Sequence, residues 1–132
     1  MDQFTRNIVD FNQNILGIGQ RQPAMLNKSE FDISIECLQE EIREFVEAHS
    51  SGDFIGSIDA IIDLRYFAVG VLYKLGLTAE QIEQMDQAVH DANMQKKLGK
   101  KAGRGDGVAA DAVKPEGWVS PEERIAAILD RK

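Results

Sequence analysis

With 132 residues, the chain is long enough for a single hydrophobic core, so we expect residues 1–132 to form one domain. Its net charge of -7 and pI of about 4.8 argue against nucleic-acid binding through clustered Lys and Arg, and indicate that metal ions would mediate any contact with phosphates. The single cysteine, Cys37, excludes an intramolecular disulfide and agrees with a cytoplasmic location.

Two amphipathic helices are predicted on either side of a loop at residues 17–28, which contains two glycines and a proline. The first helix has a stripe of apolar residues and ends at Gly17. Its stripe consists of Phe4, Ile8, Phe11 and Ile15. The second helix runs from about Ser29 to His49, and its core stripe consists of Phe31, Ile35, Leu38, Ile42 and Phe45.

A third helix, from about Asp53 to Leu75, is apolar almost all round. Such a helix is expected at the buried centre of a bundle or of an oligomer. Asp59, Asp63 and other charged residues argue against a membrane span, because each costs roughly 2.5–3.5 kcal/mol at the centre of the bilayer. We therefore expect no membrane association.

Two further helices complete the predicted fold. Gly76 is a candidate C-cap, and a capping box formed by Thr78 and Gln81 predicts a fourth helix that stops at Gly99. Residues 99–118 are Gly-rich and basic and are predicted to be a flexible loop, and a short helix follows them. No segment has the alternation of a useful strand, so the predicted fold is all-α: a compact bundle of about four helices with a short C-terminal helix.

The second helix carries an unusual concentration of glutamates. They are Glu36, Glu40, Glu41, Glu44 and Glu47. Glu36, Glu40 and Glu47 lie roughly opposite the apolar stripe, towards water, and a solvated acidic face is the favoured explanation for Glu36 and Glu47. Glu44 and especially Glu41 lie at the margin of the stripe, where a neighbouring helix would pack. Carboxylates one turn apart repel each other, so a solvated acidic face explains Glu40, Glu41 and Glu44 less well.

Asp59 and Asp63 lie one turn apart on the apolar third helix. An unpaired buried carboxylate costs several kcal/mol, so these residues need partners. An ion pair with Arg65 is one explanation, and a metal site formed with the glutamates of the second helix is the other. All-oxygen ligands suit Mg²⁺ or Mn²⁺, whereas a di-iron centre would need Glu-x-x-His pairs that this chain lacks.

Four polar or basic residues in the C-terminal half of the chain are candidate phosphate ligands. Asn93 and Lys96 lie three residues apart near the end of the fourth helix, and Arg104 and Lys114 follow in the basic loop. Stabilisation of the helix dipole is the alternative explanation for the lysines on the helix. Trp118 can stack on a base or anchor the tail. Asn12 and Asn14, at the end of the first helix, are candidate base-binding residues, although exposed helix polarity explains them equally well.

Four motifs in this order resemble the MazG-like and phosphoribosyl-ATP pyrophosphohydrolase-like superfamily of all-α nucleotide pyrophosphohydrolases. They are ECLQEEIREFVEA at 36–48, IDAIIDLRYFAVGVLYKLGL at 58–77, HDANMQKK at 90–97 and RGDGVAADAVKPEGWVSPE at 104–122. The last is similar to the tail of phage-type members, which would place the chain in the host cytoplasm.

The resemblance implies a dimer or tetramer that binds two or more Mg²⁺ or Mn²⁺ ions per site. Its implied metal ligands are Glu41, Glu44 and Asp59, with Asp63 as a further candidate. Glu40 would be a ligand or would activate the attacking water, and Asn93, Lys96 and the tail cations would bind phosphates. One departure is that Gly56 and Ala60 occupy positions where the family usually has glutamate, so Asp63 or Asp53 would have to supply a ligand.

The phage-like tail favours hydrolysis of a deoxypurine triphosphate, dGTP, to the monophosphate and pyrophosphate. Phosphoribosyl-ATP and dUTP or dCTP are alternative substrates. A different class of function is a non-catalytic helical scaffold, which the missing glutamate favours and the two aspartates disfavour. The sequence leaves open the symmetry of the oligomer and the phosphorus atom that is attacked.

Overall fold

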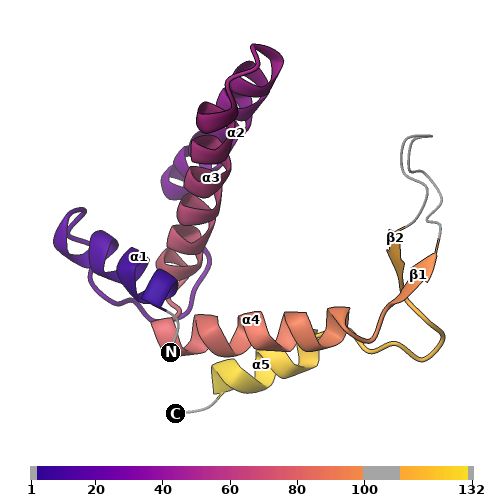
Figure 1. The fold of residues 1–132 in the computed structure, drawn as a ribbon. Coiled ribbons are helices and arrows are strands. Elements are labelled where there is room, and N and C mark those ends of the chain that lie inside the picture. Colours follow the sequence, from indigo (N-terminus) through magenta and orange to yellow (C-terminus); the bar gives the residue numbers. More distant parts are fainter. Residues whose placement is uncertain (1–2, 100–110, 131–132) are drawn as a thin grey trace. The chain divides into compact units, whose positions relative to one another are not determined.

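The computed structural model of the protein describes residues 3–99 and 111–130. Within these residues the chain forms five helices and one two-stranded sheet, and its packing divides it into two units, residues 1–82 and 83–132. The elements are α1 (Gln3–Asn14), α2 (Lys28–Ser50), α3 (Phe54–Lys74), α4 (Ala79–Asn93), β1 (Lys97–Gly99), β2 (Asp111–Val113) and α5 (Glu122–Asp130) (Figure 1).

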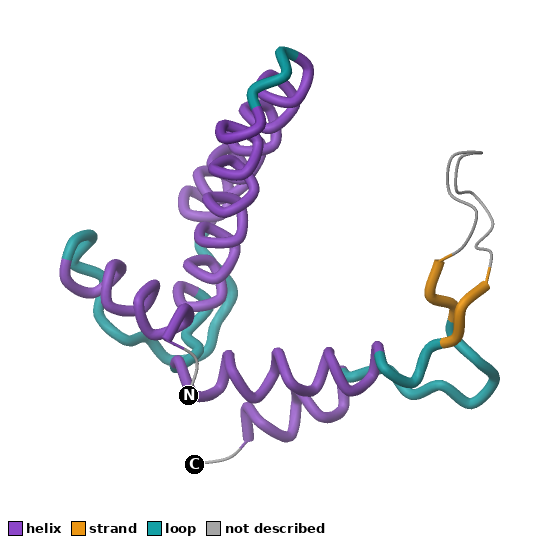
Figure 2. The backbone as a smooth tube through the Cα atoms, in the orientation of Figure 1, coloured by secondary structure: helices purple, strands orange, loops and turns teal. Residues whose placement is uncertain are grey.

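The long α2–α3 hairpin dominates the first unit (Figures 1 and 2). Its tight turn depends on Gly52, which has a φ of 75° that side chains rarely adopt. Asp53 then caps α3, because its side chain accepts a hydrogen bond of 2.9 Å from the backbone N–H of Gly56. At the other end of the hairpin, the side chain of Asn27 caps α2 by accepting from the N–H of Glu30. These caps fix where both helices begin.

The connection between α1 and α2 is held against the C-terminal end of α3. Tyr73, which is fully buried, donates from its hydroxyl to the carbonyl of Ile18 at 2.8 Å. Arg21 makes two hydrogen bonds with the carboxylate of Glu30, at 3.0 and 2.7 Å. The C-cap of α3 is Leu75, and Gly76, the predicted C-cap, is the residue after it, with a φ of 96°. The connection therefore positions α1, which packs against α3.

In the second unit, α5 is joined to α4 by an ion pair of 2.6 Å between Arg124 and Asp91. The indole N–H of Trp118 donates to the carbonyl of Ala92 at 2.7 Å, which anchors the segment before α5 to the end of α4. β1 and β2 pair antiparallel, with Lys97 opposite Val113.

The capping box that begins α4 is confirmed, since Thr78 and Gln81 exchange hydrogen bonds of 3.0 and 3.1 Å. The predicted end of this helix at Gly99 is wrong, because α4 ends at Asn93 and residues 97–99 form β1. The all-α prediction is confirmed for the described residues, which are mostly helical, and a small two-stranded sheet in the same place is an addition to it. Strand pairing between segments far apart in the sequence leaves no signal in helical periodicity.

The predicted core stripe of α2 is only partly covered in the single chain, where Leu38 and Phe45 are half-buried. Phe31, Ile35 and Ile42 are exposed, whereas Ser34 and Glu41 on the same helix are buried. The reason is that α2 packs mainly on α3 and leaves its other faces uncovered.

The apolar surface of α3 is also largely exposed within the chain, notably at Phe54 and Ile55. Its predicted place at the centre of a bundle is therefore not found in the single chain, and its place in an oligomer stays a prediction. Among the described helices, none combines the length and the apolar character that crossing a membrane requires.

Candidate metal centre

Three carboxylates from the two helices of the hairpin converge. Glu41 and Glu44 come from α2 and Asp63 from α3, and one oxygen of each lies within 4.8 Å of the others. Glu41 and Glu44 are three residues apart and so share one face of α2. The antiparallel packing of α3 brings Asp63 to that face. Three carboxylates at this separation form a set of hard oxygen ligands suited to a divalent cation.

Glu41 is the most perturbed member of the cluster. Its side chain is buried, and no hydrogen-bond partner for its Oε2 is found among the described residues. Burial, followed by the nearby carboxyls of Glu44, Asp63 and Glu40, raises the pKa of Glu41 to about 7. A buried carboxyl with an unsatisfied oxygen and like-charged neighbours is the environment that a bound cation would relieve. The cluster therefore fits a divalent metal ion.

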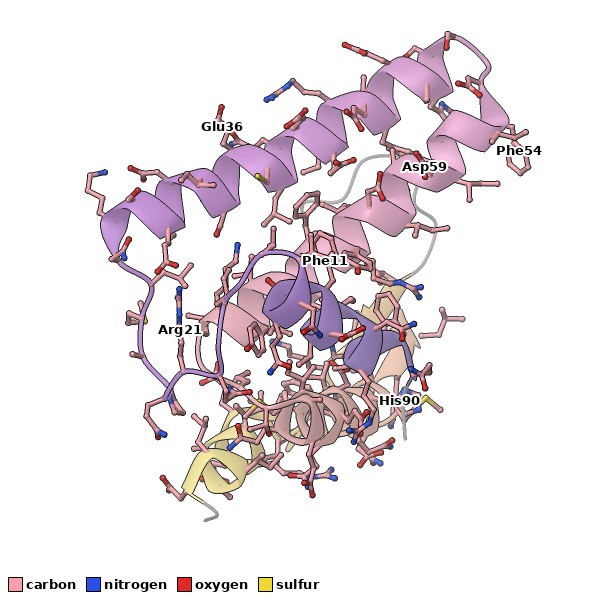
Figure 3. The ribbon with its side chains drawn as sticks, turned by 90° about the vertical axis from the view of Figure 1, so that its left-hand side faces the viewer. Phe11, Arg21, Glu36, Phe54, Asp59 and His90 are labelled. Atoms are coloured by element: carbon pink, nitrogen blue, oxygen red, sulfur yellow. The ribbon has the colours of Figure 1, made fainter. Side chains whose placement is uncertain are left out.

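Asp63 is half-buried, and burial is the main cause that raises its pKa, with Asp59 and Glu44 contributing. Asp59 itself is exposed and is not one of the three clustered carboxylates, although its charge acts on Asp63. The expected buried pair of aspartates is therefore corrected to one half-buried and one exposed residue. Asp59 lies at the N-terminal side of α3 (Figure 3), where the described part of the chain leaves it accessible.

The remaining glutamates of α2 lie where the helical geometry placed them. Glu36 and Glu47 are exposed, and Figure 3 shows Glu36 on the side of α2 that faces away from α3. Glu40 is exposed beside the cluster, and its charge contributes to the raised pKa of Glu41. Glu40 thus acts on the site electrostatically without being one of the three clustered carboxylates, of which Glu41 is buried, Asp63 half-buried and Glu44 exposed.

A glutamate at Gly56 or Ala60 would disturb the local structure. A Cβ atom at Gly56 would meet Oδ2 of Asp53, so the side chain that caps α3 would have to move. Ala60 is buried, so a longer acidic side chain there would have to enter the packed interface. Asp53 is committed to the cap, whereas Asp63 lies in the cluster. Of the two substitutes for the missing ligand, the geometry favours Asp63.

Two of the four predicted phosphate ligands, Lys96 and Lys114, lie near Trp118. The ammonium groups of Lys96 and Lys114 lie 5.2 and 4.9 Å from the centroid of its ring, within the range of cation–π contacts. Asn93 is the exposed last residue of α4. Arg104 lies outside the described residues.

The two predicted base-binding asparagines are in different environments. Asn12 is buried, and its Nδ2 donates to the carbonyl of Ile8 at 2.9 Å. Asn14 is exposed, and its amide donates to the carboxylate of Asp10.

A cavity of about 400 Å³ lies between α1, α2 and α3, and it extends from Asp63 to Lys74. Sequence patterns did not indicate this cavity, because its walls come from three helices whose apolar stripes do not define it. Asn12, Ser34 and Cys37 are among its lining residues. Ser34 is buried although the apolar residues beside it on α2 are exposed. This burial would have indicated the cavity, but it is visible only once α2 is packed on α3.

Comparison with known proteins identifies the family. A family profile for phosphoribosyl-ATP pyrophosphohydrolase matches residues 9–93, which include α2, α3 and the three clustered carboxylates. No curated protein matches the chain significantly. The resemblance inferred from the four sequence motifs is thus confirmed at the level of the family. The chain belongs to the phosphoribosyl-ATP pyrophosphohydrolase family and is a pyrophosphohydrolase, a hydrolase acting on phosphoric anhydride bonds.

Proposed function

We propose that the protein hydrolyses a deoxypurine nucleoside triphosphate, with dGTP favoured, to the monophosphate and pyrophosphate in a reaction that depends on Mg²⁺ or Mn²⁺. The observation that carries this proposal is the cluster of Glu41, Glu44 and Asp63, in a chain of a pyrophosphohydrolase family. The cluster is acidic, so a triphosphate would be repelled from it without cations. Metal dependence follows from this charge.

Each carboxylate has a proposed role. Glu41, Glu44 and Asp63 hold the metal, and the exposed Asp59 contributes to a second metal position. When bound, Mg²⁺ or Mn²⁺ supplies Lewis-acid stabilisation of the charge that develops on the phosphates. Glu40 accepts the proton of the attacking water, because it is exposed to solvent beside the cluster.

The cations of the second unit are proposed to bind phosphate oxygens. The ammonium groups of Lys96 and Lys114 both lie over the ring of Trp118. Asn93 and Arg104 complete the proposed set from the sequence alone. Asn12, Asn14 and Trp118 remain proposed contacts of the base.

The choice of dGTP rests on the resemblance of residues 104–122 to the tails of phage-type relatives. Phosphoribosyl-ATP is the second candidate substrate, because the family profile that matches the chain describes an enzyme for that compound. Both reactions would use the same carboxylate cluster. They differ in the base and sugar that the protein must accommodate.

Hydrolysis of a panel of triphosphates and phosphoribosyl-ATP with Mg²⁺ or Mn²⁺, with products resolved by anion exchange, tests the proposal. We expect monophosphate and pyrophosphate, with dGTP fastest. Glu44→Gln should reduce kcat by at least about 100-fold through loss of a ligand. Glu47→Gln is the matched control, because Glu47 is exposed on the same helix and lies outside the cluster. Equal activity of both variants would remove the proposed site.

We further propose that the chain forms a homo-oligomer through the exposed apolar surface of the hairpin. Phe54 and Ile55 are 76% and 79% exposed, and a groove lined by Phe45, Ile58 and Ile62 lies beside them. Contiguous apolar surface of this kind is unusual on a monomer. Light scattering after size exclusion should show a dimer or tetramer that Ile55→Asp dissociates, while Met25→Asp, in a loop, should not.

A further inference from the structure

The cavity between α1, α2 and α3 adjoins the candidate metal centre. Asp63 belongs to both, as a member of the acidic cluster and as a lining residue of the cavity. The volume of about 400 Å³ is within the range of about 300–1,000 Å³ that is usual for small-molecule sites. A ligand held at the cluster can therefore extend into the cavity without leaving the first unit.

The residues of α2 change character along the face that carries the cluster. Ser34 and Cys37 line the cavity, and Glu41 and Glu44 follow on the same face at steps of three and four residues. One end of this face is therefore acidic, and the other is apolar with one hydroxyl.

The facing side of α3 changes in the same way, in the antiparallel direction. From Asp63, the lining residues Phe67, Gly70 and Lys74 recur at steps of four, three and four residues. The two helices thus place their acidic parts together, and the other end of the cavity is lined by apolar residues and by Lys74. A charged group with an uncharged, ring-shaped extension matches this division.

Aromatic and polar groups occur together in the cavity. Phe11 and Tyr66 line it and pack edge to face, with ring centroids 5.6 Å apart (Phe11 is labelled in Figure 3). The amide of Asn12 lies against Gly70, where an added Cβ would be 3.5 Å from Nδ2. An apolar site with a few fixed polar groups is typical of sites that select one organic ligand.

Ser34 is the strongest sign that a ligand completes the cavity. It is 7% exposed, and within the described chain its Oγ has no hydrogen-bond partner. A buried hydroxyl without a partner is costly, and such groups in proteins usually require an explanation. A serine side chain has three staggered positions, so its Oγ can turn towards a ligand in the cavity.

We propose that this cavity binds the nucleoside part of the substrate, with Ser34 and Asn12 contacting the base and the α-phosphate directed to Asp63. The inference rests on the proposed function for the position of the phosphates. It adds Ser34 as a specificity-determining residue and assigns the base to the end of the cavity away from the carboxylates.

Cys37 provides a direct test, because it lines the cavity and is the only cysteine of the chain. The rate of its alkylation by N-ethylmaleimide is measured with Mg²⁺ alone, with inorganic tripolyphosphate, and with the α,β-imido analogue of dGTP. At about ten times its Kd, the analogue should slow the reaction about tenfold. Tripolyphosphate lacks a nucleoside and should leave the rate unchanged.

Three outcomes of this experiment would overturn the inference. Equal protection by tripolyphosphate would show that phosphates alone cover Cys37. No protection by the analogue, at a concentration that inhibits hydrolysis, would place the nucleoside elsewhere and leave the proposed function intact. A thiol that reacts only after denaturation would show that the cavity is already covered. Conversely, protection by the analogue without hydrolysis of any triphosphate would refute the proposed function alone.

Substitution of Ser34 separates a role in binding from a role in folding. Ser34→Ala removes a buried oxygen that has no partner, so the melting temperature should stay the same or rise. KM should rise about 2- to 10-fold with kcat unchanged, as expected for loss of one hydrogen bond to the bound substrate.

The matched control is Ser57→Ala on α3. Ser57 is buried to the same extent, but its Oγ donates to the carbonyl of Asp53 at 2.7 Å. This variant should lower the melting temperature and leave KM unchanged. A Ser34→Ala variant that behaves in the same way as this control would overturn the assignment of Ser34.

Discussion

Replacing Glu41 by Gln should stabilise the metal-free protein while removing its response to metal. The fold raises the pKa of Glu41 from 4.5 to about 7, so ionisation is unfavourable in the native state. Each tenfold change in proton affinity is worth about 1.4 kcal/mol, which gives about 3 kcal/mol at a pH where the carboxylate is fully charged. The neighbouring carboxylates share this energy, so we expect Gln to recover about 1–3 kcal/mol at pH 8.

The shape of the side chain is conserved in this variant. Glutamine has nearly the same volume as glutamate, and its amide can donate to the carboxylate of Glu44, which already interacts with Glu41. Thermal unfolding at pH 8 in EDTA should show a melting temperature about 3–10 °C above that of the wild type.

Addition of millimolar Mn²⁺ should reverse the order of the two proteins. A ligand that binds only the native state raises the melting temperature by mass action, by about 2.7 kcal/mol at 100 times Kd. The wild type should gain most of this, and Glu41→Gln should gain little and lose activity. Glu36→Gln is the control, because Glu36 is exposed on the same helix. A lower melting temperature for Glu41→Gln in EDTA, or an undiminished response to Mn²⁺, would refute the reasoning.

Three further measurements follow. Calorimetry should show that Mn²⁺ affinity rises from pH 5.5 to 7.5, since a proton on Glu41 competes with the metal until the pH passes about 7; a flat profile would contradict this. Gly76→Ala should cost about 2 kcal/mol or more in chemical denaturation, because φ is 96° and a Cβ would meet the backbone oxygen of Gln22. Gly19→Ala is the control: Gly19 faces open space, so the change in stability should be within about 0.5 kcal/mol. Pyrophosphate should change the fluorescence of Trp118, and Lys114→Ala should weaken that change if the ammonium group over the ring binds the anion.

The helix boundaries were largely predictable from local sequence. Asp53 and the Thr78–Gln81 capping box act through hydrogen bonds within three residues, so their effect is visible in the chain itself. Glu41 was predicted to lie against a neighbouring helix because of its angle relative to the apolar stripe, and it is buried. Helix caps, and the side of a helix on which a residue lies, can thus be inferred without tertiary structure.

Features that depend on pairing between distant segments could not be predicted in the same way. The β1–β2 pair joins residues 97–99 to residues 111–113, and nothing in either segment alone distinguishes it from helix or loop. The burial of Ser34 and the exposure of Ile35 invert the order that hydrophobicity predicts, because contact with α3, rather than side-chain polarity, decides which face of α2 is covered. The cavity also depends on the packing of α2 on α3, so it could not be predicted from the sequence either.

In the α2–α3 hairpin, the carboxylates that are proposed to bind metal are also the residues that oppose folding. Three carboxylates within 4.8 Å oppose folding when no cation is present, and the raised pKa values of Glu41 and Asp63 express that opposition. A purely structural helix pair would gain stability by replacing Glu41 with an apolar residue of similar volume. The presence of the buried carboxyl of Glu41 among other carboxyls is therefore better explained by cation binding than by helix packing. The same reasoning supports the proposed role of Ser34, whose buried oxygen has no hydrogen-bond partner among the described residues.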